Sequence, residues 1–165
     1  MHAVSENQTT VQPNSSAQLS ISIEVVAYIV LLIVAILIRV ADLDRVPLTE
    51  FEAQQALAPL HAINPNTPGE AVVANSPMTY WTQLVAFTAF GANEFSARIG
   101  TVVAGVLLAL SPLLFRSRFG VTRTFIWSLL LTLLTIPVIA SRYAEGTTWM
   151  MLFTVLTMWM VWRYW

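Results

Sequence analysis

Carboxylates and arginines are the side chains of this sequence that can do chemistry, and they fall into three clusters. The first holds Glu50 and Glu52, the second is Arg98, and the third pairs Arg142 with Glu145. A carboxylate can take a proton from an acceptor group, so Glu52 and Glu50 are candidate catalytic bases or metal contacts. An arginine can hold a phosphate through paired hydrogen bonds, so Arg98 and Arg142 are candidate substrate-binding residues. In the alternative interpretation, each charge caps a helix or lies among lipid headgroups.

Several other kinds of site are excluded or find no support. The chain has no cysteine, which excludes disulfides, thiolate metal sites and cysteine nucleophiles. His2 and His61 are the only histidines, so no pair within one helix could bind haem or a pigment, and His61 is interpreted as an interfacial or loop residue. Glycine-rich nucleotide, zinc-protease and serine-hydrolase motifs are absent. The net charge of −1 does not indicate a nucleic-acid partner, and the cofactor stays open, a divalent metal ion included.

The elements that must position these clusters are membrane-spanning helices. Of the 165 residues, 56% are hydrophobic and only 10% are charged, against about 25% charged in ordinary soluble domains. Three stretches, 99–115, 124–141 and 146–162, contain no charged residue, and each is about as long as a membrane crossing requires. The pattern predicts an all-α, multi-pass transmembrane protein.

Four spans are predicted, and the charges between them set their orientation. The spans cover 21–41, 99–115, 124–141 and 146–163, after a disordered polar tail over 1–20. The loop 116–123 carries Arg116, Arg118 and Arg123, and short basic loops stay on the cytoplasmic side. The amino terminus is therefore expected in the cytoplasm, the chain in a cell (inner) membrane, and residues 42–98 in one large outer loop.

The outer loop is predicted to hold two helices that lie on the membrane surface. Thr49 is a suitable N-cap, and the carboxylates of Glu50 and Glu52 in the next turn favour the helix dipole. The apolar stretch 78–90 is shorter than the roughly 20 residues of a span, and its polar residues recur at helical spacing. If this stretch did cross the membrane, the amino terminus would lie outside instead.

The order of these segments resembles the amino-terminal part of the GT-C glycosyltransferases, in particular the protein O-mannosyltransferases and lipid A aminoarabinose transferases. The segments that carry the resemblance are RVADLDRVPL, TEFEAQQAL, NSPMTYWTQLVAFTAFGANEFSARIG, FRSRFG and SRYAEG. The most specific stretch is 77–100, which includes Arg98. The resemblance implies surface helices on the outer side and transfer of a sugar from a polyprenyl-phosphate carrier to an acceptor there. It covers about a third of a usual family member, its amino-terminal portion.

The resemblance also implies which positions would act. An Asp-Glu pair that supplies the base or a metal partner falls at Phe51 and Glu52, so the aspartate is replaced. Ser76 stands where the bacterial branch commonly has a lysine that meets the lipid phosphate, and Glu145 is the acidic residue nearest the one expected near Thr147. Ser76 and Glu145 therefore join the candidate substrate-binding residues.

Two functions follow from these observations. The first is a membrane glycosyltransferase that uses membrane lipid and a polyprenyl-phosphate sugar. The second is a non-catalytic accessory subunit of a larger membrane complex, because Phe51 cannot accept a proton and Ser76 cannot neutralise a phosphate. In that case its apolar helix faces would pack against other membrane subunits.

Overall fold

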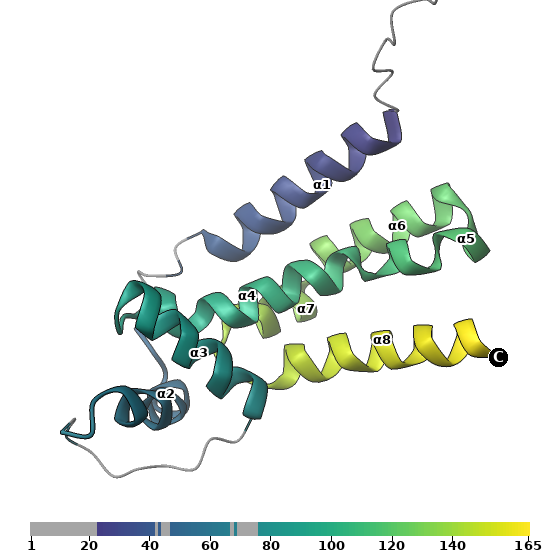
Figure 1. The fold of residues 1–165 in the computed structure, drawn as a ribbon. Helices are drawn as coiled ribbons and strands as arrows, with labels where there is room; N and C mark the ends of the chain where they lie inside the picture. Colours follow the sequence, from purple (N-terminus) through teal and green to yellow (C-terminus); the bar gives the residue numbers. More distant parts are fainter. Residues whose placement is uncertain (1–22, 42, 44–46, 67, 69–75) are drawn as a thin grey trace, which may run out of the picture.

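The computed structural model describes residues 23–165 except 42, 44–46, 67 and 69–75 (Figure 1). Over these residues the protein is all-helical, with no strand, which confirms the predicted all-α class. The tail predicted for 1–20 lies outside the described residues. In chain order the elements are α1 (Ile23–Val40), α2 (Glu50–Ile63), α3 (Pro77–Phe90), α4 (Glu94–Leu110), the 3-10 helix η1 (Ser111–Phe115), α5 (Arg116–Phe119), α6 (Val121–Leu133), α7 (Thr135–Arg142) and α8 (Thr147–Tyr164).

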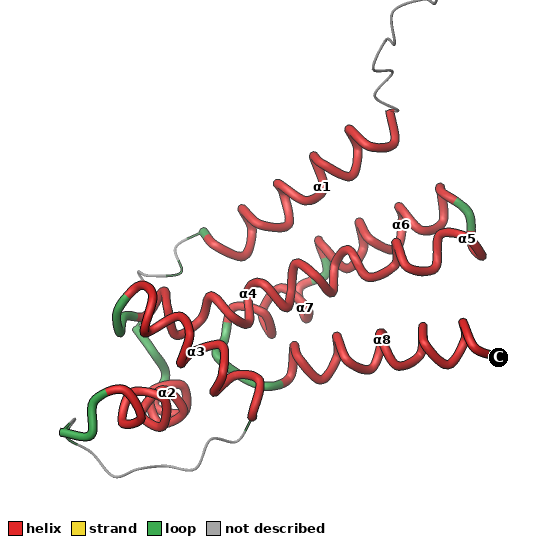
Figure 2. The backbone as a smooth tube through the Cα atoms, in the orientation of Figure 1, coloured by secondary structure: helices red, strands yellow, loops and turns green. Residues whose placement is uncertain are grey.

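The longer helices run lengthwise, and the two helices of the predicted outer loop gather at one end. Figure 1 shows α4 in the centre, with α6 and α7 in line behind it and α8 beside it, while α2 and α3 lie at the end where α4 begins. The start of α1, α5 and the end of α8 lie at the opposite end (Figure 2). An ion pair of 2.8 Å between Arg116 and Glu24 joins α5 to α1 there.

Two helical stretches are long and apolar enough to cross a membrane, and a third qualifies if a bent pair counts as one span. The two are Ile23–Val40 and Glu94–Phe119, and the pair is α6 with α7, which meet at an angle of 55°. The structure thus supports two or three of the four predicted spans. The fourth predicted span, 146–163, corresponds to the 18-residue helix α8. This helix is not among the candidate spans, because its threonines and tryptophans lower its mean hydropathy.

The span predicted over 124–141 is bent because its helix is interrupted at Leu134, which has an extended backbone. Pro137 has no N–H to donate and lies in the first turn of α7, where a missing donor is tolerated. The carbonyls at the end of α6 lack donors within their own helix. Arg39 of α1, which is 0% exposed, donates from Nη2 to one of them, Leu131, at 3.2 Å.

Helix α3 packs with its polar side against the protein. Thr79 and Gln83 are buried, and Gln83 Nε2 donates to the Ala97 carbonyl of α4 at 3.1 Å. Trp81 and Val85, one turn apart on the other side, are 59% and 64% exposed. A short helix with an outward apolar face is what a position at a membrane surface requires.

Close contact between α3 and α4 depends on a residue without a side chain. Gly100 faces Thr82 so closely that a Cβ atom at position 100 would collide with the Thr82 side chain. Small residues allow helix backbones to approach in this way. The first two turns of α4, which carry Arg98 and Gly100, are thereby held against α3 at the end of the bundle.

Candidate functional site

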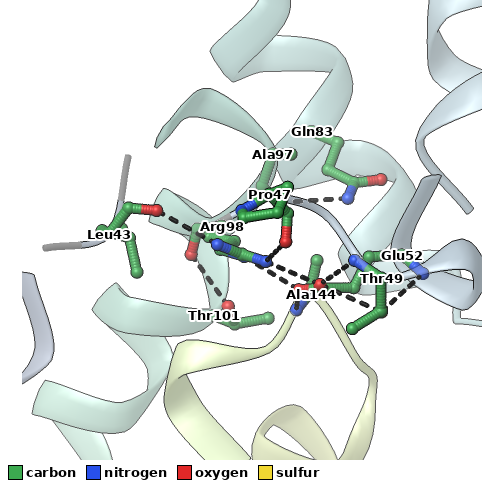
Figure 3. A network of polar contacts seen from close by, with 9 residues as sticks. All are labelled: Leu43, Pro47, Thr49, Glu52, Gln83, Ala97, Arg98, Thr101 and Ala144. Carbon is green, nitrogen blue, oxygen red and sulfur yellow. Dashed lines mark hydrogen bonds and ion pairs between the residues drawn. The ribbon is translucent and has the colours of Figure 1, made fainter. Parts of the chain in front are cut away.

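A buried ion pair between Glu52 and Arg98 lies where α2 and α3 meet α4 (Figure 3). Arg98 Nη2 donates to Glu52 Oε2 at 2.7 Å, and Nε donates to Oε1 at 2.9 Å, so the contact is bidentate. Glu52 is 0% exposed and Arg98 is 2% exposed. A guanidinium and a carboxylate can be buried together at this depth because each satisfies the other.

Helix capping at the start of α2 holds the Glu52 side chain in position for this contact. Thr49 is the N-cap of α2, and Glu52 is its third residue, which together form a capping box. The backbone N–H of Thr49 donates to Glu52 Oε2 at 2.9 Å, while Thr49 Oγ1 accepts from the Glu52 N–H at 3.3 Å. The same carboxylate therefore closes the start of α2 and receives Arg98.

The network extends to two further segments of the chain. Arg98 donates to the carbonyls of Leu43 and Pro47, both at 3.1 Å, in the connection between α1 and α2. The backbone N–H of Ala144, between α7 and α8, donates to Glu52 Oε1 at 2.8 Å. With α2 and α4, which carry the pair itself, the network therefore joins four parts of the chain (Figure 3). The pair thus fixes the loops on which the remaining candidate residues lie.

Glu52 is held as an anion by its surroundings. Burial raises the pKa of a carboxyl group, but the hydrogen bonds from Arg98, Ala144 and Thr49 outweigh that effect and lower the pKa of Glu52 below its ordinary value. Both of its oxygens accept from protein donors, and neither is exposed. This arrangement suits a residue that positions its neighbours, because a general base must be within reach of its substrate.

A cavity of about 390 Å³ lies beside this network, between α2, α3 and the start of α8. Its lining includes a carboxylate, an amide, a hydroxyl and three aromatic rings, from Glu145, Gln55, Ser76, Phe51, Trp149 and Phe153. The residue before Glu145 is Ala144, whose N–H is held by Glu52. The ion pair therefore sets the position of the loop that carries the carboxylate of the cavity.

The walls of the cavity come from residues one helical turn apart. Phe51 and Gln55 line it from α2, and Trp149 and Phe153 line it from α8, with ring centroids 6.1 Å apart and planes 29° from parallel. Trp149 is 8% exposed, and its indole N–H has no hydrogen-bond partner in the part of the chain that the structure describes. Such a lining offers flat apolar surfaces with a few polar groups that can orient a ligand.

Ser76 and Gly146 bring the two sides of the cavity together. Ser76 is the N-cap of α3, and its hydroxyl accepts from the Thr79 N–H at 3.4 Å. A Cβ atom added at Gly146 would lie 2.7 Å from the Ser76 Cβ. Only glycine permits this approach, which brings the start of α3 next to the start of α8.

The structure separates the predicted site residues into two groups. Glu52 and Arg98 lie together but bind each other, while Ser76 and Glu145 line the cavity. Glu50 is exposed at the start of α2. Glu50, Arg142 and His61 do not line the cavity.

Arg142 has a contact away from the cavity. Arg142 Nη2 donates to the Ala41 carbonyl at 2.7 Å, which links the end of α7 to the end of α1. Among the described residues, no group of three or more histidine, aspartate and glutamate side chains could hold a metal ion.

The sequence interpretation missed Gln55, Trp149 and Phe153. The signal that could have found them is spacing, because Phe51 and Gln55, like Trp149 and Phe153, are four residues apart and share a helix face. Over the described residues, the protein is all-helical, has apolar helices suited to a membrane and has a cavity at one end. Comparison with known proteins adds no family: no family model, curated protein or solved structure matches the chain.

Proposed function

We propose that this protein is a membrane glycosyltransferase of the GT-C type, which transfers a sugar from a polyprenyl-phosphate donor on the outer face of the membrane. In this proposal α8 is a fourth span, the amino terminus is cytoplasmic and the membrane is the cell's inner membrane. The observation that carries the proposal is the cavity that joins Ser76 and Glu145, two residues selected for substrate binding from the sequence, at the end formed by α2 and α3.

The size and lining of the cavity support a sugar as its occupant. At about 390 Å³ it lies within the range of small-molecule sites, which is roughly 300–1,000 Å³. The rings of Trp149 and Phe153 offer apolar faces to a sugar ring. Gln55 and Glu145 can bind hydroxyl groups, the carboxylate as acceptor and the amide as donor and acceptor. No arginine lines the cavity, so we place the sugar and not the phosphate there.

Glu145 is then the carboxylate that accepts a proton from the attacking hydroxyl, and Glu52 is a positioning residue. Glu145 is half-buried at the cavity, whereas the oxygens of Glu52 are occupied by Arg98, Thr49 and Ala144. Glu52 acts on Glu145 through the preceding residue, Ala144. Arg142, at the end of α7, is the candidate for the phosphate of the donor.

The second candidate function is a non-catalytic accessory subunit of a larger membrane complex. The observation in its favour is that Glu52 and Arg98 satisfy each other, which leaves two of the candidate residues with a structural task. Under this proposal the cavity would bind nothing that reacts, and the network would serve to hold α2 and α3 against α4.

The two proposals are separated by a transfer assay on the full chain in proteoliposomes, with a labelled polyprenyl-phosphate sugar and a mixture of lipid and peptide acceptors. Glu145→Gln should lower the rate at least 100-fold, which is the lower range for removal of a general base. Glu50→Gln, an exposed carboxylate outside the cavity, is the matched control and should retain the wild-type rate. Absence of transfer by the wild-type protein with every donor would favour the accessory subunit.

A further inference from the structure

A second polar cavity lies at the opposite end of the molecule from α2 and α3. It measures about 280 Å³ and is formed where η1 and α5 meet the last turns of α8. Its polar lining comes from Arg118 and Ser117 on one side and from Arg163 and Trp159 on the other. Figure 1 shows α5 and the end of α8 at this end of the structure. Two cations therefore face one small space.

Neither arginine is neutralised by a carboxylate within the described residues. The ion pairs there join Arg98 to Glu52 and Arg116 to Glu24. Arg163 lies over the Trp159 ring, with 5.4 Å between its guanidinium carbon and the ring centroid. The indole N–H of Trp159 donates to the Leu114 carbonyl at 3.0 Å, which fixes the ring. The cavity thus presents positive charge on a rigid support and offers no negative group of its own.

An apolar groove adjoins this cavity. It has a volume of about 1110 Å³ and follows α8, where Met150, Phe153, Met158 and Val161 line it. Arg118 and Trp162 line both the groove and the polar cavity, so the two spaces lie next to each other. At 1.5 Å per helical residue, the distance from Met150 to Val161 is about 16 Å, close to half of the roughly 30 Å hydrocarbon thickness of a bilayer.

We propose that this end of the protein is a binding site for an anionic phospholipid. The phosphate lies between Arg118 and Arg163, and one acyl chain follows the groove along α8. Guanidinium groups bind phosphate oxygens through paired hydrogen bonds, and their charge complements the anionic headgroup. The groove has the length of an acyl chain in one leaflet, and its charged end lies where the headgroup of that leaflet would be. The phosphate end of this site lies at the opposite end of α8 from the sugar cavity, although Met150 and Phe153 line both the groove and that cavity. The proposal does not rest on the proposed function.

The phospholipid explains the charges better than a second protein helix does. A helix could cover the apolar groove, but it would also need carboxylates at one end to neutralise Arg118 and Arg163. A free phosphate could bind the two arginines, but it would leave the groove unfilled. Only an amphiphile with a negative headgroup satisfies both parts of the site at once.

The test measures quenching of tryptophan fluorescence in the full chain by brominated lipids in mixed micelles. Trp159, Trp162 and Trp165 line the two spaces and report on the bromine atoms. Brominated phosphatidylglycerol should reach half-maximal quenching at about 25-fold lower concentration than brominated phosphatidylcholine, since each arginine contributes about fivefold to binding of an anionic headgroup. Arg118→Gln and Arg163→Gln should each remove about fivefold of this preference.

Arg123→Gln is the matched control. Arg123 is exposed in the first turn of α6 and lines neither space, so its substitution should change the preference less than twofold. Equal quenching by the two lipids, or an effect of Arg123→Gln as large as that of Arg118→Gln, would overturn the proposal. Thr157→Phe, which fills the groove, should weaken phosphatidylglycerol binding, and competition by inorganic phosphate at equal concentration would contradict the role of the groove.

Discussion

Among the described residues, two arginines are buried, and their surroundings differ completely. Arg98, at the end formed by α2 and α3, makes a bidentate contact with Glu52 and also donates to the carbonyls of Leu43 and Pro47. Arg39, among the long helices, donates only to the carbonyls of Ala35 and Leu131, and its Nε has no hydrogen-bond partner among the described residues. Within the described part of the chain, the Arg98 charge is neutralised by a carboxylate, and the Arg39 charge is met by backbone carbonyl dipoles.

The difference indicates two separate tasks. The Arg98 network joins four segments of the chain and fixes the loop beside Glu145, so loss of either partner leaves a buried charge. Arg39 instead satisfies a carbonyl at the end of α6, where the helix is interrupted. Within a membrane, a helix break is tolerated only if its free backbone groups find partners. The Arg98 network therefore positions the candidate site, and the Arg39 contacts stabilise the bend between α6 and α7.

The largest effect is expected from removal of the carboxylate that pairs with Arg98. Glu52→Ala should lower the free energy of unfolding by about 3–5 kcal/mol, because the guanidinium of Arg98 would remain buried without its counter-ion. Unfolding of the full chain in mixed micelles, followed by circular dichroism, measures this change. Glu50→Ala should change stability by less than about 0.5 kcal/mol, since Glu50 is exposed. Similar losses for the two variants would contradict the role of the pair.

The second prediction concerns pH and is expected to have a smaller effect. The pKa of Glu52 is lower in the folded protein than its ordinary value of 4.5, so the unfolded chain binds its proton first as the pH falls. The contribution of Glu52 to stability is therefore fully present above pH 4.5 and is lost as the pH falls toward the lowered pKa. Unfolding measured from pH 7 downward should show this loss in the wild type. In Glu52→Gln that part of the pH dependence should disappear, and an unchanged profile would exclude Glu52 as its source.

The smallest effect is expected at the other arginine. Arg39→Met removes a buried charge together with its hydrogen bonds to two carbonyls. Because the desolvation cost of the guanidinium disappears as well, it offsets most of the free energy lost with those hydrogen bonds. Stability should change by about 1 kcal/mol or less, whereas Arg98→Met should cost about 3–5 kcal/mol because it strands Glu52. The same unfolding measurement compares the two variants directly. A loss for Arg39→Met as large as that for Arg98→Met would show that the two sites do not differ in the way described.

Local signals in the sequence predicted much of the fold. The N-cap at Thr49 and the carboxylates after it predicted the start of α2, and the structure confirms a capping box there. The short length of 78–90 predicted a separate helix, and α3 ends within that stretch. These features depend on residues a few positions apart, for which helix geometry leaves few alternatives.

Features that depend on distant contacts were not predictable in the same way. Glu52 and Arg98 were chosen as separate candidates, and nothing in their local sequence indicates that they bind each other across 46 positions. The break at Leu134 lies in a stretch without charge, where Pro137 was the only local signal. Spacing indicates that Gln55 shares a helix face with Phe51, but only the packing of α2 against α3 decides that this face lines the cavity.

The rate of sugar transfer by the wild-type protein and by Glu145→Gln, measured side by side in proteoliposomes, tests most directly whether the cavity is a catalytic site. The account predicts transfer by the wild type from a polyprenyl-phosphate sugar and a loss of at least about 100-fold in Glu145→Gln. Equal rates for the two proteins, with lipid donor and protein amounts matched, would contradict it.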